Sequence, residues 1–214
     1  MSPFNRRKFL GAAVAAGIAP MFYLPAKGRD TSLAPMSDIG KSKWDLDSPA
    51  LCVDLDKMER NLKKGQVSLK ATGLGARPHA KTHKCPAIAK MQIAAGAIGI
   101  CTAKLSESEV MLENGIASVL MTGVNLSVQK INRAMSLRKK YGGFIQAVDN
   151  PQNANDLQDA AKAAGIKADV VVDINVIRRS GVLPGAPALA LAQQVDKSPN
   201  LRFRGILAYD GGVQ

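Results

Sequence analysis

A regular alternation of short apolar segments and longer helical stretches constrains the fold of this chain more than any other feature. Seven segments are short and rich in apolar or β-branched residues: ALCVDL, ARPHAKTH, AIGICTA, SVLMTGV, GFIQAV, ADVVVDINV and FRGILAY. Stretches with helical signals separate them; for example, Asn150-Pro151 opens one predicted helix and Gly165 closes it. This order predicts an α/β fold in which the strands of a parallel sheet alternate with helices.

Two architectures share this order, an open doubly wound sheet and an eight-stranded barrel. No G-x-G-x-x-G motif follows the first predicted strand, so the dinucleotide-binding form of the open sheet loses support. A complete barrel needs about 250 residues, more than residues 48–214 supply. We therefore predict a TIM-type barrel that is incomplete, with about seven of its eight strands, and we expect the sequence to be a fragment of a longer protein.

The first 30 residues are predicted to be an export signal. Arg6 and Arg7 precede Lys-Phe-Leu and a moderately apolar run that is too short and too weak for a stable membrane span. This pattern is similar to a twin-arginine signal, which implies export of a folded protein to the periplasm, although an ordinary secretory signal or an uncleaved anchor would share part of it. Residues 31–47 lack a clear period and are predicted to be a linker, which leaves 48–214 as the domain.

The basic composition does not by itself indicate nucleic-acid binding. Residues 1–30 contribute +4 of the net charge of +12, and the remainder is scattered along segments such as RNLKK and SLRKKYGG, with little aromatic side chain between them to stack on bases. The three cysteines, Cys52, Cys85 and Cys101, form no C-x-x-C pair, so neither a zinc knuckle nor a disulfide framework is predicted. We expect free, buried thiols.

The segment ARPHAKTHKCP concentrates cationic side chains around one lysine. If the segment is extended, its side chains alternate, and His79, Lys81 and His83 point to one face. On a barrel strand that face is the interior, and catalytic groups gather at the carboxyl end of such strands. Neighbours such as Arg77 and Lys84, together with desolvation, would lower the pKa of the lysine and yield an amine able to form an imine with a carbonyl.

Two other interpretations of this segment stay open. His79 and His83 could bind a metal ion together, although four residues along a strand place them roughly 13 Å apart, too far to share one ion. The segment could instead be a solvated basic edge strand, because lysine is usually exposed. The residues alone indicate a lysine-centred site in an α/β domain.

Four motifs, in this order, resemble the D-threonine aldolase and D-serine dehydratase family. They are PALCVDLDKMERNL with RPHAKTHKCP, then GICTAKLSESEVMLENGI, VDINVIRRSGV and GILAYDGGVQ, and they extend over residues 45–214. The resemblance implies a barrel of the alanine racemase N-terminal type, as found in the fold-type III enzymes that bind pyridoxal 5'-phosphate.

The resemblance also implies roles for single residues. Lys81 is implied to be the catalytic lysine that forms the internal Schiff base of the cofactor. Arg179 matches an arginine beside the cofactor ring, although Arg178 could equally be the inward one, and Tyr209 matches a tyrosine that lines the active site and takes part in catalysis. His79 and His83 are implied to lie in the cofactor site, and no metal ligand is expected in this sequence.

The activity implied is that of a pyridoxal-phosphate-dependent lyase acting on D-configured β-hydroxy amino acids, by retro-aldol cleavage to glycine and an aldehyde. A D-serine or D-hydroxyaspartate dehydratase of the same family, an amino acid racemase of the same barrel type and a non-catalytic cofactor-binding fragment remain open. Family members continue into a C-terminal β-domain that supplies a site for manganese or zinc, and they commonly form homodimers. We expect both features of a full-length protein only.

Overall fold

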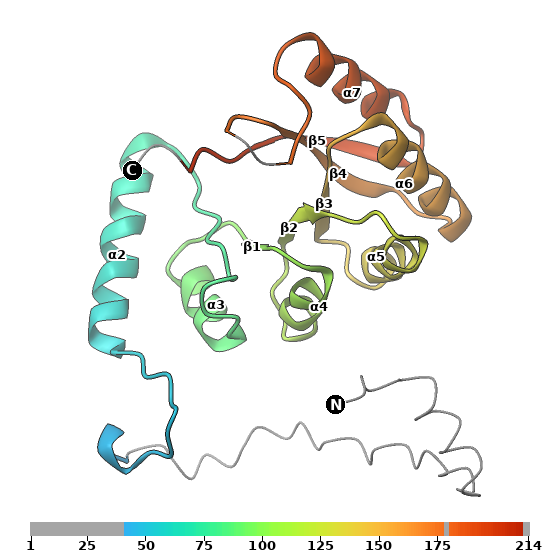
Figure 1. Cartoon of the computed structure of the whole chain (residues 1–214). Coiled ribbons are helices and arrows are strands. Elements are labelled where there is room, and N and C mark those ends of the chain that lie inside the picture. Colours follow the sequence, from blue (N-terminus) through green and yellow to red (C-terminus); the bar gives the residue numbers. More distant parts are fainter. Residues whose placement is uncertain (1–40, 178–179, 212–214) are drawn as a thin grey trace, which may run out of the picture. The chain divides into compact units, whose positions relative to one another are not determined.

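Parallel pairing of five strands, in sequence order, organises the residues that the computed structural model describes, 41–177 and 180–211. The strands are β1 (Ile100–Thr102), β2 (Val119–Val124), β3 (Phe144–Val148), β4 (Ala168–Ile174) and β5 (Leu201–Ala208). Between consecutive strands lie the helices α4 (Leu105–Glu113), α5 (Val128–Lys140), α6 (Pro151–Ala164) and α7 (Ala186–Lys197). The predicted alternation of strands and helices is therefore confirmed, and Figure 1 shows α4 to α7 in succession along one side of the strands.

Contacts divide the chain into two units, with the boundary between Val53 and Asp54. The described part of the first unit holds a short 3-10 helix, η2 (Lys43–Asp45). The second unit contains the sheet and its helices, together with α2 (Leu55–Thr72) and α3 (Pro86–Ala94), which precede β1 in the chain.

The ends of α6 lie where its sequence signals predicted them, for physical reasons that the structure shows. Asn150 is extended and its side-chain oxygen accepts a hydrogen bond from the Asn153 N–H at 2.9 Å, which satisfies one of the unpaired donors of the first turn. Pro151 follows as the first helical residue, where a missing N–H costs nothing. Gly165 ends the helix with a φ of 64°, a left-handed conformation that glycine adopts without a Cβ clash.

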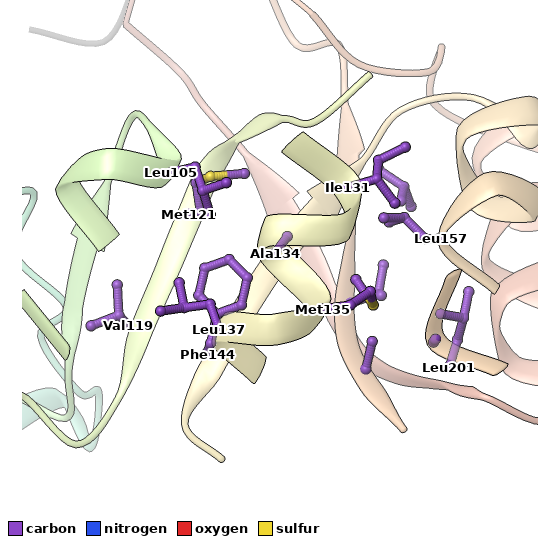
Figure 2. Close-up of a cluster of buried hydrophobic side chains, with 14 of the residues drawn as sticks. Leu105, Val119, Met121, Ile131, Ala134, Met135, Leu137, Phe144, Leu157 and Leu201 are labelled. Carbon is purple, nitrogen blue, oxygen red and sulfur yellow. The ribbon is translucent and has the colours of Figure 1, made fainter. Parts of the chain in front are cut away.

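The sheet buries a different set of side chains on each face. The face toward the helices forms the main core, in which strand residues pack against helix residues, and Figure 2 labels Leu105, Val119, Met121, Ile131, Ala134, Met135, Leu137, Phe144, Leu157 and Leu201 in it. The opposite face holds a smaller cluster, formed by Ile145, Ala147 and Val171 with Leu120 and Leu207 packed against them. Burial on both faces explains why the central strands read as nearly continuous apolar runs.

A buried carboxylate near the amino end of β4 gathers three arginines. The side chain of Asp169 is only 4% exposed and accepts two hydrogen bonds from Arg202, both at 2.7 Å. Arg138 approaches at 3.1 Å from α5, and Arg204 lies at 3.4 Å. Burial lowers the pKa of the Arg138 guanidinium, and the charge of Asp169 opposes that effect. The cluster therefore links α5, β4 and β5 through one buried carboxylate, with Arg138 largely buried and the two arginines of β5 about half exposed.

The predicted number of strands, about seven of the barrel's eight, was too high for the described residues. No strand forms over 50–55, because Asp54 instead caps α2 by accepting a hydrogen bond from the Lys57 N–H at 3.0 Å. The segment 76–83 contributes a single bridge, between His79 and Cys101, and then turns away. A strand needs a continuous partner, and neither segment has one.

Some expectations from the sequence lie outside the described residues. These are the export signal over 1–30, most of the linker over 31–47, and Arg178 and Arg179. Among the residues that the structure describes, no helix combines the length and apolar character needed to cross a bilayer.

From the burial of Asp169 we predict that two carboxylate-to-amide substitutions differ strongly in their effect on the free energy of unfolding. Asp169→Asn leaves the largely buried Arg138 without its counter-charge, so we expect the free energy of unfolding to fall by about 3 kcal/mol. The matched control is Glu109→Gln, since Glu109 also binds an arginine, Arg133, through two hydrogen bonds but with side chains that are 25% and 56% exposed. We expect the control to lose at most about 1 kcal/mol. Equal losses in chemical denaturation would contradict the role given to burial.

Candidate functional site

A cavity of about 370 Å³ opens at the carboxyl ends of the strands, on the face opposite the helix-packed core. Its lining consists of Arg77, His79, Lys81, Cys101, Ala103, Thr122, Asp173, Ile174, Val176, Ser180, Leu207, Ala208 and Tyr209. In parallel sheets the carboxyl ends of all strands meet at one edge, so polar residues far apart in the sequence converge there. This edge is the candidate functional site.

Lys81 lies on a turn instead of the predicted strand. The backbone pairs with β1 only around His79, through Ala80 N–H to Cys101 O at 2.8 Å and Cys101 N–H to Pro78 O at 2.7 Å. The chain then turns, because the N–H groups of the two residues after Thr82 both donate to the Ala80 carbonyl. Strand alternation therefore does not place the lysine.

The turn still brings two of the three predicted side chains of this segment into the cavity. His79 and Lys81 line it, whereas His83 does not. His83 Nδ1 accepts the Cys85 N–H at 3.0 Å, and its Nε2 is buried without a hydrogen-bond partner in the described part of the chain. Because the His83 ring is hydrogen-bonded to the backbone of Cys85 and does not line the cavity, the structure gives no support to the predicted contact of His83 with a cofactor.

Tyr209 enters the cavity from the residue that follows β5. Its ring centroid lies 5.7 Å from Lys81 Nζ, within the range of a cation–π contact, although the ring is 49% exposed. The two predicted catalytic residues, separated by most of the chain, are thus brought together. Arg179 falls outside the described residues, so its predicted place beside a cofactor ring stays a prediction.

The cationic neighbours of the lysine each have a partner of their own, although Arg77 also lines the cavity. Arg77 Nη1 donates a hydrogen bond to Ser118 Oγ at 3.0 Å. The Arg77 guanidinium also lies so close to Gly99 that a Cβ at that residue would collide with it. Lys84 Nζ pairs with Glu107 Oε1 at 3.5 Å. The positive charges of this segment are therefore distributed over separate partners.

Several polar residues that line the cavity were not predicted from the sequence. Asp173 is 5% exposed, near the end of β4, and accepts a hydrogen bond from Ser180 Oγ at 2.8 Å. Thr122 of β2 lies opposite His79, with Oγ1 3.2 Å from the ring Nε2. An acidic residue at the end of the apolar run ADVVVDINV was a usable signal for Asp173. No local pattern marks Thr122, whose importance comes from pairing between strands.

The three cysteines are free thiols, as predicted, but they differ in exposure. Cys52 is exposed, and Cys85 and Cys101 are half-buried, so burial of all three was a wrong expectation. Burial raises the pKa of the Cys101 thiol, and the nearby charge of Arg77 partly offsets this. Cys101 therefore contributes a neutral, weakly polar surface to the cavity.

Metal binding finds no support in the described residues. Over 41–177 and 180–211, no three side chains of histidine, cysteine, aspartate or glutamate lie together in a way that could hold an ion.

The chain matches a family model described as alanine racemase, N-terminal domain, over residues 53–212. It is 36% identical to a D-threonine aldolase of Arthrobacter sp over 187 residues, which covers 87% of this chain and 49% of that protein. It is 32% identical to a D-threo-3-hydroxyaspartate dehydratase of Delftia sp. (strain HT23), covering 79% of this chain and 42% of the relative.

Solved structures agree with these matches. The crystal structure of D-threonine aldolase from Filomicrobium marinum superposes with a TM-score of 0.75 at 43% identity, covering 78% of this chain and 45% of that one. The chain spans about half the length of the curated relatives it matches. These matches confirm the resemblance inferred from the motifs and the incomplete barrel of alanine racemase N-terminal type.

Glu107, which accepts a hydrogen bond from the cavity-lining residue Ala103, is predicted to make a pH-dependent contribution to the stability of the protein. Burial alone would raise the pKa of this carboxyl, but the Ala103 N–H, at 2.9 Å, and the charge of Lys84 hold it below its ordinary value of 4.5. A lowered folded-state pKa stabilises the protein above the unfolded pKa, and that stability is lost as the pH falls through the folded value. Glu107→Gln should therefore cost about 1 kcal/mol at pH 7, and the difference from wild type should vanish in acid.

Denaturant unfolding of both proteins across this pH range measures the effect. Lys84→Met is the matched control, because it removes the ion pair and keeps the hydrogen bond from Ala103. A difference between wild type and Glu107→Gln that stays constant into strong acid would contradict the assignment.

Proposed function

Because this chain belongs to the alanine racemase N-terminal domain family, we propose that it carries the cofactor site of a pyridoxal-phosphate-dependent lyase acting on D-configured β-hydroxy amino acids. The reaction proposed is retro-aldol cleavage, as in a D-threonine aldolase, to glycine and an aldehyde. The relatives named D-threonine aldolase support this choice, at 36% and 43% identity.

One observation carries the proposal: Lys81, His79 and Tyr209, predicted from the motifs, line the same cavity at the carboxyl ends of the strands. A volume of about 370 Å³ lies within the range of ligand sites, about 300–1,000 Å³. The position at this edge of a parallel sheet is the usual one for catalytic groups in barrel enzymes.

The residues present fit pyridoxal phosphate in three respects. The side chain of Lys81 is accessible from the cavity, so its amine can bond to the aldehyde carbon of the cofactor with loss of one water. The Tyr209 ring beside it offers an aromatic surface, and Arg77 adds a cation to the lining. When bound, the cofactor supplies an electron sink that stabilises negative charge at the carbon next to the amine.

The other polar residues orient these groups and hold protons. His79 fixes the backbone of Lys81 by accepting its N–H at 3.1 Å. Asp173, buried in the cavity wall, offers a carboxylate that can hold a cationic amine or accept a proton, and Ser180 orients that carboxylate. The Tyr209 hydroxyl can donate a hydrogen bond to an anionic group.

The remaining features of the full-length protein are proposals from the sequence. Residues 1–30 support export by a twin-arginine route to the periplasm, and Arg179 is proposed to lie beside the cofactor ring. A homodimer and a manganese or zinc site are proposed from the family resemblance. The described residues do not fit a metal ion, so we assign the metal no ligand and no step in this chain.

A dehydratase is the second candidate, because a relative at 32% identity is named D-threo-3-hydroxyaspartate dehydratase. Analysis of the products separates the candidates. Glycine with an aldehyde indicates cleavage, a keto acid with ammonia indicates dehydration, and an inverted but intact substrate indicates racemisation. Cofactor binding without turnover of D-threonine or D-serine, in the presence of manganese or zinc, would indicate a non-catalytic binding protein.

Trapping with borohydride tests the role of Lys81. After incubation with pyridoxal phosphate and reduction, we expect one covalent adduct, mapped by mass spectrometry to Lys81. Lys81→Met should lose this adduct by at least about tenfold. Lys84→Met is the matched control, because Lys84 lies three residues away, pairs with Glu107 and does not line the cavity. Adducts spread over surface lysines in wild type, or an equal loss in both variants, would overturn the proposed cofactor site.

A further inference from the structure

Three consecutive hydrogen bonds connect the turn that carries Lys81 to β2, and from there to β1. The backbone N–H of Lys81 donates to His79 Nδ1 at 3.1 Å. His79 Nε2 lies 3.2 Å from Thr122 Oγ1, and Thr122 Oγ1 donates to the Thr102 carbonyl at 3.1 Å. The chain of hydrogen bonds therefore passes from the turn through an imidazole and a hydroxyl to β1.

The protons in this chain have only one possible arrangement. The Thr102 carbonyl can only accept, so the hydroxyl proton of Thr122 points to it, and Oγ1 must accept from His79. The Lys81 N–H can only donate, so His79 Nδ1 carries no proton. The Thr122 end requires a proton on Nε2, and the Lys81 end requires Nδ1 to be without one; the two requirements together define a neutral imidazole with its proton on Nε2.

We propose that Thr122 is a positioning residue for Lys81, which acts by holding His79 in the neutral Nε2–H tautomer and in one ring orientation. The functional meaning of this inference rests on the proposed role of Lys81 as the residue that bonds to the cofactor. Thr122 lines the cavity, and its hydroxyl is engaged with His79 and the Thr102 carbonyl. Its effect passes through the ring of His79 to the lysine backbone.

The turn needs this support because strand pairing ends immediately before it. The backbone pairs with β1 around His79, and after Ala80 the remaining hydrogen bonds join residues of the turn to one another. The imidazole is the link from Lys81 to β2 that the described residues show. A protonated His79 could not accept the Lys81 N–H, so loss of the neutral state would release the backbone of the lysine.

Close approach of β2 to its neighbour fixes the position of Thr122. The next residue, Gly123, lies so near the Ala103 carbonyl that a Cβ would collide with it. The pairing of β2 with β3 also shifts register between Met121 and Val124. The hydroxyl is thus presented from a constrained segment of backbone, which suits an orienting role.

Three variants separate this role from simple packing. Thr122→Val keeps the size of the side chain and removes the hydroxyl, whereas Thr122→Ser keeps the hydroxyl. Ser108→Ala is the matched control, because Ser108 also hydrogen-bonds a threonine hydroxyl, Thr102 Oγ1 at 2.7 Å, in a buried place that does not line the cavity.

The first measurement uses the protein without cofactor. The chain contains two histidines, so imidazole ¹⁵N shifts can be assigned with the help of a His83→Gln variant. We expect His79 to be neutral with the proton on Nε2, and the exchange of the Lys81 amide with solvent to become about three- to tenfold faster in Thr122→Val. Thr122→Ser and Ser108→Ala should stay near wild type. A cationic or Nδ1–H His79 in wild type, or unchanged exchange in Thr122→Val, would overturn the proposal.

The second measurement follows the rate at which pyridoxal phosphate, trapped by borohydride, becomes attached to Lys81. We expect a decrease of about three- to tenfold in Thr122→Val and recovery in Thr122→Ser. An equal decrease in Ser108→Ala would show a general effect of lost packing and would overturn the positioning role. Absence of any adduct in wild type would instead count against the proposed function, while amide exchange at Lys81 would still decide the role of Thr122.

Discussion

Parallel strand pairing is the constraint on which the rest of this structure depends. Because β1 to β5 all run in one direction, each must be followed by a crossover, and the helices α4 to α7 supply it. The same constraint directs every carboxyl end to one edge of the sheet. The helices cover one face, and the cavity opens on the other, at that edge. The position of the candidate site therefore follows from the strand topology and does not depend on which side chains line it.

The residue proposed to react lies where this regular pairing stops. Lys81 follows a single bridge to β1, and side-chain hydrogen bonds replace the strand contacts that would otherwise fix it. The backbone of this lysine, which we propose to bond to a cofactor, is therefore held by the imidazole of His79 and by the turn, not by a central strand. The cost is dependence on a few polar contacts, each of modest net energy, about 0.5–1.5 kcal/mol.

Charge is arranged differently at the two ends of the sheet. Near the amino ends, the buried carboxylate of Asp169 binds arginines in a compact cluster whose role is structural. At the carboxyl ends, Arg77 and Lys84 are each held by a neighbour, and the lysine stands apart from them beside an aromatic ring. Basic side chains thus stabilise the fold around Asp169, whereas at the opposite end of the sheet the amine of Lys81 is accessible from the cavity.

The sequence by itself determined the α/β class, the order of helices and strands, and the capping residues of α6, because periodicity and turn chemistry act over a few neighbouring residues. Its motifs also identified Lys81 and Tyr209, which the cavity brings together. Only the tertiary structure decided that residues 50–55 and 76–83 form no full strand, since pairing needs a partner that local sequence does not show. For the same reason the sequence did not show that Thr122 and Asp173 line one cavity, although the apolar run before Asp173 marked that residue, because register across the sheet relates segments distant along the chain.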